Sequence, residues 1–181
     1  MTTTTTIDGV YELDRTHSSV DFEVTHMQVS TFRASFADVD VRLVVRNGTR
    51  ELEGRVLVES ASIGDPPEFR EHVVRSAEFF DAGAHPEITF RSTSVDLRED
   101  GTATVAGELT IRGVSRAVTA DGTHTGPTTD PFGATRAGLE LEATVDRRAW
   151  SLDWQAPLPD GGDALGWAVR IVARLELIRT D

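Results

Sequence analysis

Three consecutive stretches of alternating apolar and polar residues, at 87–97, 102–111 and 116–121, constrain the fold of this chain more than any other feature. A period of two residues is the pattern of a β-strand that buries one face. The pair Asp100-Gly101 separates the first two stretches and suits the backbone conformation of a tight hairpin turn. The region therefore predicts an antiparallel meander.

The same alternation predicts which side chains of the meander point inward. We expect four apolar residues to face the interior, namely Ile88, Phe90, Leu109 and Ile111. Their polar neighbours should face solvent, namely Thr89, Arg91, Glu108 and Thr110. Gly107 interrupts the inward row of the second strand, and we expect it to leave space that no side chain fills.

The length of the stretches favours a closed barrel. Strands usually have about five or six residues, and these are longer. A strand of about 12 residues spans roughly 40 Å, and the tilt of roughly 35–45° in a closed barrel leaves a height of about 30 Å. A barrel of that height encloses an elongated space, which suits a long, thin molecule.

Alternation also occurs on both sides of the meander. It is expected to form strands at 10–14, 20–26, 39–45, 52–58, 137–145 and 167–177. The dipeptide Asn47-Gly48 marks another hairpin turn, and residues 66–74 form the main expected helix, with Asp65 as its N-cap. Residues 27–36 break the alternation and are expected to cover one end. We predict an all-β, extended, eight-stranded antiparallel barrel with one main short helix.

The domain organisation follows from the same pattern. Residues 9–181 are expected to form a single barrel domain, since no linker divides them and 181 residues suit one domain. Residues 1–8 begin with Met and five consecutive Thr, and we expect them to form a disordered polar tail.

The charge of the chain excludes several partners. A formal net charge of −12 disfavours nucleic acid and anionic membrane surfaces, because both require clustered positive charge. Stable membrane insertion is not expected, since no stretch approaches 18 consecutive apolar residues. The N-terminus lacks the pattern of a secretory signal, so we expect a cytoplasmic protein.

The residues that could carry chemistry are few. The chain has no Cys and 5 His, and none of the His spacings is typical of a metal site. Ser18 and Ser19 follow His17, but adjacent strand residues point to opposite faces and no nucleophile-elbow motif is present. We therefore expect no enzymatic activity, no catalytic or metal-ligating residues and no cofactor.

Three motifs in order resemble the YceI-like polyisoprenoid-binding family. They are 17–22 with His26-Met27, then 76–81 with 86–92, and finally 107–116. The resemblance covers roughly residues 10–180. It implies a lipocalin-like barrel whose interior holds a polyisoprenoid or other long-chain amphiphilic lipid. Two segments depart from the family pattern, at 33–36 and 146–152.

With that resemblance, the inward apolar positions become the expected lipid-binding residues. They are Phe22, Val24, His26, Phe32, Phe36, Val41, Leu43, Phe79, Phe80, Ile88, Phe90, Leu109, Ile111, Leu139, Leu141, Trp150, Trp167 and Ile171. Phe79 or Phe80 is expected to plug an end of the barrel.

The expected function is binding, storage or transport of that lipid. Two alternatives stay open at this point. One is an enzyme that acts on an isoprenoid quinone or related lipid. The other is a protein–protein interaction module whose barrel is filled by side chains, since an eight-stranded barrel is just wide enough for either arrangement. The sequence is also compatible with a homodimer.

Overall fold

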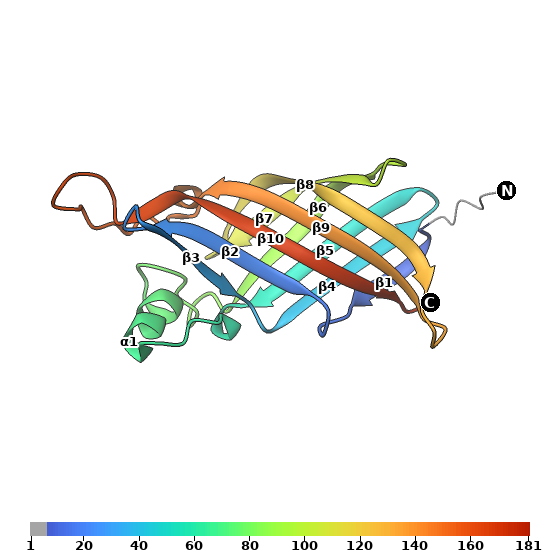
Figure 1. The fold of residues 1–181 in the computed structure, drawn as a ribbon, viewed down its shortest axis with the longest axis horizontal. Coiled ribbons are helices and arrows are strands. Elements are labelled where there is room, and N and C mark those ends of the chain that lie inside the picture. The colour runs from blue at the N-terminus through green and yellow to red at the C-terminus, as the bar shows by residue number, and fades with distance from the viewer. Residues whose placement is uncertain (1–6) are drawn as a thin grey trace.

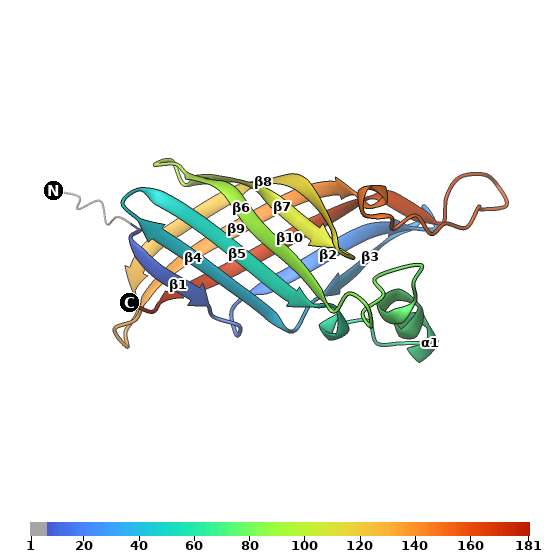
Figure 2. The ribbon, with the colours of Figure 1, turned by 180° about the vertical axis from the view of Figure 1, so that it is seen from behind.

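The structure is a computed structural model that describes residues 7–181. Ten β-strands form one antiparallel sheet that wraps into a barrel (Figures 1 and 2). The strands are β1 Gly9–Leu13, β2 Ser19–His26, β3 Ser30–Ser35, β4 Val39–Arg46, β5 Thr49–Leu57, β6 Glu87–Leu97, β7 Thr102–Ile111, β8 Val114–Thr129, β9 Thr135–Asp146 and β10 Leu165–Arg179. Residues 1–6, where most of the expected tail falls, lie outside the described residues, and Ile7 packs against the core.

The ten strands make eight staves. Strands β1 and β2 both pair with β10, one after the other, so they act as one interrupted stave. Strand β4 pairs with β1 and β3 pairs with β2, so β3 and β4 form a second interrupted stave. The remaining six strands follow in chain order from β5 to β10. The predicted eight-stranded antiparallel barrel is therefore confirmed.

The predicted register of the meander is confirmed as well. Phe90 pairs with Leu109 across β6 and β7, and Leu109 and Ile111 are buried. Arg91 lies on the opposite face, where it is exposed and pairs with Glu53. The turn at Asn47-Gly48 is also as predicted, because both residues have positive φ angles, as a tight hairpin turn requires.

The helical segment lies within one residue of its predicted position, with α1 at Pro67–Arg70 followed directly by the wider helical turn η2 at Glu71–Arg75. Three other local predictions were wrong. The N-cap of α1 is Pro66 without a side-chain cap, so Asp65 does not serve that purpose. Residues 27–36 contain the strand β3, because Phe32 and Ala34 continue the inward alternation of a hairpin with β2. Strand β8 extends eight residues beyond the predicted end at 121.

One end of the barrel, which we call the packed end, holds β1 and the C-terminus (Figure 1). Aliphatic side chains and one tyrosine fill it, and the most deeply buried are Tyr11, Leu43, Leu139 and Leu177. On its outer surface Arg136 donates hydrogen bonds to the carboxylates of Asp14, Asp130 and Glu176. The strand ring is complete here, since β1 bridges β10 and β4.

The opposite end, which we call the hollow end, carries α1 and the loop at 151–164 (Figures 1 and 2). Here β3 has β2 as its strand neighbour on one side only, among the described residues. Residues 58–86, the plug segment, cover the other side. Backbone hydrogen bonds fix this segment, from Ser62 N to Ser35 O at 2.8 Å and from Ala37 N to Ser60 O at 3.1 Å. The wall is therefore completed by the plug segment rather than by another long strand.

Candidate functional site: an apolar cavity at the hollow end

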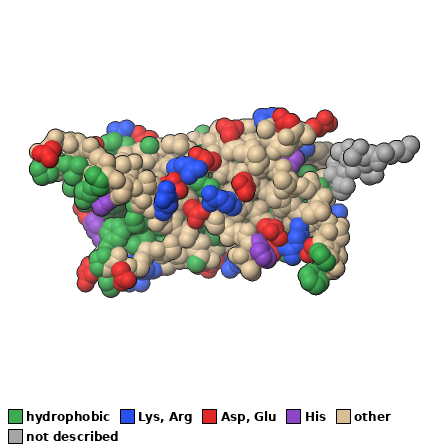
Figure 3. Space-filling model, viewed as in Figure 1, with side chains coloured by type: hydrophobic (Ala, Val, Ile, Leu, Met, Phe, Trp, Pro, Cys, Tyr) green, Lys and Arg blue, Asp and Glu red, His purple; other side chains and the backbone are tan. Residues whose placement is uncertain are grey.

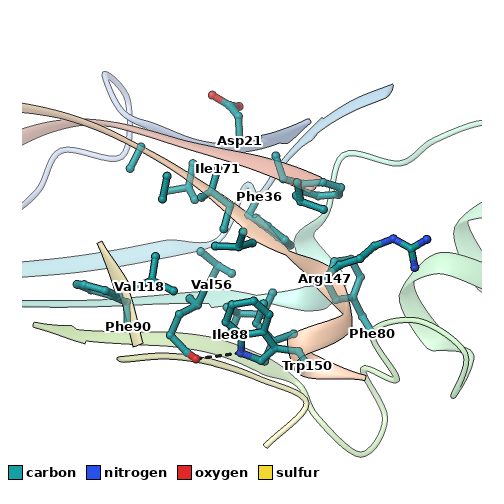
Figure 4. A pocket seen from close by; sticks show the side chains of 18 of the residues that line it. Asp21, Phe36, Val56, Phe80, Ile88, Phe90, Val118, Arg147, Trp150 and Ile171 are labelled. Atoms are coloured by element: carbon teal, nitrogen blue, oxygen red, sulfur yellow. Dashed lines mark hydrogen bonds between the residues drawn. The ribbon is translucent and has the colours of Figure 1, made fainter. Parts of the chain in front are cut away.

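A cavity of about 300 Å³ occupies the hollow half of the barrel. Apolar side chains from the staves and from the plug segment line it (Figure 4). Its volume is at the lower end of the range of ligand pockets, about 300–1,000 Å³. An apolar cavity of about 150 Å³ holds benzene, so this one accommodates on the order of a dozen carbon atoms.

Most of the expected lipid-binding residues line this cavity. They are Phe22, Val24, His26, Phe32, Phe36, Val41, Phe79, Phe80, Ile88, Phe90, Leu109, Ile111, Leu141, Trp150 and Ile171. The set spans seven strands, the plug segment and the short helical turn η3 at Arg147–Trp150. Residues far apart in the sequence thus converge on one apolar space.

Three expected lining residues lie elsewhere. Leu43 and Leu139 are fully enclosed in the packed end, below the cavity. Trp167 points away from the cavity because the register of β10 against β2 shifts between Leu165 and Val169, which interrupts the alternation. Its indole nitrogen donates a hydrogen bond to Asp163 at 2.7 Å.

Gly107 does not provide free space, contrary to the prediction. A Cβ atom there would lie 2.5 Å from the Phe90 ring and 2.4 Å from the carbonyl oxygen of Arg91. The ring of Phe90 therefore packs directly over this glycine and fills the gap. Gly54 is different, since a Cβ atom there would meet only Val41 and a backbone oxygen, at 3.8 and 4.0 Å. Free space borders Gly54, which lines the cavity.

Aromatic rings form the inner wall near the hollow end. The Phe22 ring lies 5.6 Å from that of Phe36 and 5.9 Å from that of Phe80, and Phe36 and Phe80 are 6.4 Å apart. Phe32 on β3 meets Phe69 of the helix edge to face at 5.6 Å. Such tilted contacts are the favoured geometry of aromatic pairs. The predicted position of Phe80 at one end of the barrel is confirmed.

A second group of rings forms the outer rim. The ring of His72 lies 4.9 Å from Phe79 and 5.8 Å from Trp154, and Phe79 and Trp154 are 5.3 Å apart. Sequence reasoning missed His72 as a rim residue, because it belongs to no alternating stretch. Figure 3 shows hydrophobic side chains gathered at this end of the molecule, while a group of charged side chains lies near the middle of the barrel wall. The rim joins the cavity to the surface.

Hydrogen bonds hold the rim elements to the barrel. The indole nitrogen of Trp150, which is 2% exposed, donates to the carbonyl oxygen of Leu109 at 3.0 Å. Arg112, in the turn between β7 and β8, donates to Ala77 O and Ser151 O, both at 2.8 Å. A single side chain thus ties the plug segment and η3 to the meander.

Arg147 is the buried charged residue of the lining, and sequence reasoning missed it. It is 4% exposed. Its guanidinium donates to three backbone carbonyls, those of Leu152, Leu165 and Gly166. Burial lowers the pKa of Arg147 from its usual value, against the opposing effect of nearby acids. An arginine remains charged in proteins even so, and the sequence pattern gave no sign of its burial.

A cluster of potential metal ligands lies at the packed end, away from the cavity. Asp14, His17 and Glu176 place one ligand atom each within 4.8 Å of one another. Arg136 already bonds to both carboxylates, at 2.8 and 2.6 Å, and so occupies the position a cation would take. Ser18, next to His17, donates to the backbone of Glu176. These contacts indicate that the cluster holds β1, β9 and β10 together.

None of the helices in residues 7–181 is long and apolar enough to cross a lipid bilayer.

Comparisons with known proteins agree with this architecture. The model of the YceI-like domain matches residues 11–177. A UPF0312 protein of Staphylococcus aureus (strain N315) is 29% identical over 168 residues, which cover 92% of this chain and 95% of the relative. A UPF0312 protein of Pseudomonas putida is 32% identical over 139 residues, covering 75% and 72%.

Two solved structures show the same fold. The crystal structure of Burkholderia cenocepacia BcnA superposes with a TM-score of 0.72 at 18% identity, covering 93% of this chain and 99% of that one. A polyisoprenoid binding domain from Saccharophagus degradans, implicated in plant cell wall breakdown, gives a TM-score of 0.68 at 13% identity, with coverages of 94% and 98%.

Proposed function

The chain belongs to the YceI-like domain family, and from this membership and its apolar cavity we propose that it binds a polyisoprenoid or another long-chain lipid. The ligand's apolar chain would lie inside the hollow half of the barrel and its polar end at the rim. We further propose that the chain stores or transports this lipid without catalysing a reaction. A cytoplasmic location and a homodimer stay predictions.

The observation that carries the proposal is the enclosed, almost entirely apolar lining. Burial of each CH₂ group contributes roughly 0.8 kcal/mol, so a dozen carbons would contribute about 10 kcal/mol before the entropic costs of binding. The structural neighbour described as a polyisoprenoid binding domain supports the same class of ligand. A barrel filled by side chains throughout, the interaction-module alternative, would lack this space.

The cavity also limits the ligand. A long polyisoprenoid has more carbon atoms than the dozen or so that about 300 Å³ accommodates. We therefore expect most of a short chain such as farnesol to lie inside the cavity without rearrangement, with its hydroxyl end at the rim. A longer chain would leave its remainder at the rim or displace side chains of the plug segment.

The test is to block the cavity without disturbing the fold. Gly54→Phe adds a ring at a lining position where the Cβ atom meets only Val41 and a backbone oxygen, at 3.8 and 4.0 Å. Farnesol binding, measured by isothermal titration calorimetry on delipidated protein, should weaken at least tenfold while the melting temperature changes little. Ala117→Phe is the control, because it adds the same ring at an exposed position of β8. Absence of binding by the unmodified protein to farnesol and to geranylgeraniol alike would overturn the proposal.

A further inference from the structure

Two polar residues of the lining, Arg55 and Thr89, pair across β5 and β6, and the Arg55 guanidinium bonds to Asp40 and Glu87. The other polar side chains that face the cavity are nitrogen groups. His26 lies at the end of β2, His72 in the rim and Arg147 at the start of η3. Asp21, the one acid among the described lining residues, points away from the cavity in Figure 4. It accepts hydrogen bonds there from Ser19 at 2.8 Å and from Arg174 at 3.0 Å. The inner surface therefore has no carboxylate from the described residues.

Arg147 is the strongest hydrogen-bond donor of these groups, because its guanidinium is charged and has five N–H groups. No carboxylate of the described residues lies within ion-pair distance of its guanidinium, whereas Arg148, the next residue, pairs with Asp146. A buried cation without a paired anion is costly unless its donors are satisfied. A guanidinium has five N–H groups, and the three hydrogen bonds to backbone carbonyls leave donor capacity unused. The Trp167 ring stacks 4.2 Å from its central carbon and fixes its plane.

Figure 4 shows where this guanidinium lies. It extends beyond the rings of Phe36 and Phe80, on the side of the plug segment rather than in the depth of the cavity. A lipid whose chain fills the apolar part would bring its polar end to this region. The donors there favour a polar end that accepts hydrogen bonds.

Three acids lie outside this donor region. Asp146 pairs with Arg148, Asp153 is exposed, and Asp163 accepts the hydrogen bond from the Trp167 indole. All three act on Arg147 through longer-range electrostatics. They balance part of its charge, so the ligand's polar end need not be an anion.

From these contacts we propose that the ligand's polar end carries oxygen acceptors and no positive charge, and that Arg147 recognises it. The relevant chemistry is a carbonyl, amide or carboxylate oxygen at the end of an apolar chain. This inference rests on the proposed lipid binding. An amine head would place donors against donors and a cation beside a buried guanidinium, which costs binding energy.

The experiment compares three probes with the same chain, namely palmitamide, palmitic acid and hexadecylamine. Binding is followed by the tryptophan emission of delipidated protein at about 0.15 M salt, where long-range attraction to the acidic surface is screened. Palmitamide and palmitic acid should each bind at least tenfold more tightly than hexadecylamine, since one lost hydrogen bond plus repulsion is worth about a factor of ten or more.

Variants then assign the effect to Arg147. Arg147→Met, which keeps the length of the side chain and removes its donors, should reduce the advantage of the amide and acid to threefold or less. Arg148→Met removes an exposed arginine at the next position and should leave the advantage unchanged. If Arg147→Met does not fold, His72→Leu takes its place and should lower the advantage at least threefold.

The outcomes separate this inference from the proposed function. If neither farnesol nor any of the three probes binds, the proposed lipid binding itself fails, and the inference fails with it. If farnesol binds and none of the three probes does, lipid binding stands and the inference is wrong. If hexadecylamine binds as tightly as the other two, lipid binding stands and the inference about the polar end is wrong. An advantage that persists in both Arg147→Met and His72→Leu would show that these residues do not recognise the polar end.

Discussion

The packed end and the hollow end are built from the same eight staves, yet one is solid and the other encloses a cavity. Leu139 and Leu141 illustrate the difference, because both point inward from β9 and are two residues apart. Leu139 is surrounded by the core of the packed end, and Leu141 borders the cavity. Inward orientation alone therefore does not decide whether a residue fills the interior or lines a space.

Two physical differences separate the ends. Flexible aliphatic side chains fill the packed end, and they interdigitate to high density. At the hollow end, rigid rings meet edge to face, and small residues such as Gly54 and Ala143 line the wall with them. The strand ring is also complete at the packed end, whereas the plug segment completes the wall at the other. The hollow end can therefore rearrange more easily than the packed end.

The largest expected effect comes from truncating the two leucines of β9. Leu139→Ala should lower the free energy of unfolding by about 3–5 kcal/mol, because it creates a new cavity in a dense core. Leu141→Ala should cost only about 1–2 kcal/mol, since its side chain already borders empty space and leaves fewer contacts behind. Urea unfolding of both variants measures the difference. Equal losses would mean that the two ends are packed alike.

Truncating a ring of the inner wall should lower stability more than truncating a ring of the rim. Phe80→Ala removes a ring that packs on Phe22 and Phe36 and should cost about 3 kcal/mol, the lower limit of the usual range. Phe79→Ala removes a ring of the rim and should cost about 1 kcal/mol, because its partners His72 and Trp154 are partly exposed. Thermal unfolding checks both, and a larger loss for Phe79 would contradict this division of the rings.

The two glycines of the inner wall give a third contrast. Gly107→Ala should destabilise by about 1–3 kcal/mol, because its methyl group would overlap Phe90 and the Arg91 carbonyl. Gly54→Ala should be neutral or stabilise by up to about 1 kcal/mol, because the methyl group fits and the unfolded chain loses freedom. Differential scanning calorimetry measures both. A stable Gly107→Ala protein would restore the original prediction of space at that position.

These contrasts also show how far sequence reasoning reaches. Alternation fixes the face to which a strand residue points, so the barrel, its register and most of the lining were predictable. It does not fix depth along the barrel axis, which is why Leu43 and Leu139 were assigned to the lining. It also fails where a register shift interrupts a strand, as at Trp167.

Other features depend on the tertiary structure alone. Gly107 looked like a gap, but the neighbouring strand places the Phe90 ring over it. Arg147 stands between other polar residues in a connection, and nothing in that pattern indicates that three carbonyls enclose its guanidinium. The plug segment is not a strand, so the sequence indicated its helix and the place of Phe79 or Phe80 at one end, but not that the segment completes the wall beside β3.

The smallest expected effect concerns ion pairs on the outside of each end. At the packed end, hydrogen bonds from His17 and then Arg136 lower the pKa of Asp14, and Arg136 lowers the pKa of Asp130. At the hollow end, Arg148 lowers the pKa of Asp146 to about 2. A carboxylate whose pKa is lower in the folded protein than in the unfolded chain stabilises the fold above about pH 4. This stabilisation is lost as the pH falls through the folded pKa.

Replacing either arginine should therefore flatten the loss of stability in acid, and by different amounts. Arg136 contacts three carboxylates, and the side chains of Asp14 and Asp130 are only 13% and 12% exposed. Arg148 contacts one carboxylate, and it is itself 55% exposed, so water and salt weaken the pair. Between pH 5 and pH 2, the melting temperature of Arg136→Gln should depend less on pH than that of Arg148→Gln, which should follow the unmodified protein closely. The contrary outcome is a melting temperature that depends less on pH in Arg148→Gln than in Arg136→Gln. In that case the exposed ion pair of Arg148 would stabilise the barrel more than the less exposed ion pairs of Arg136.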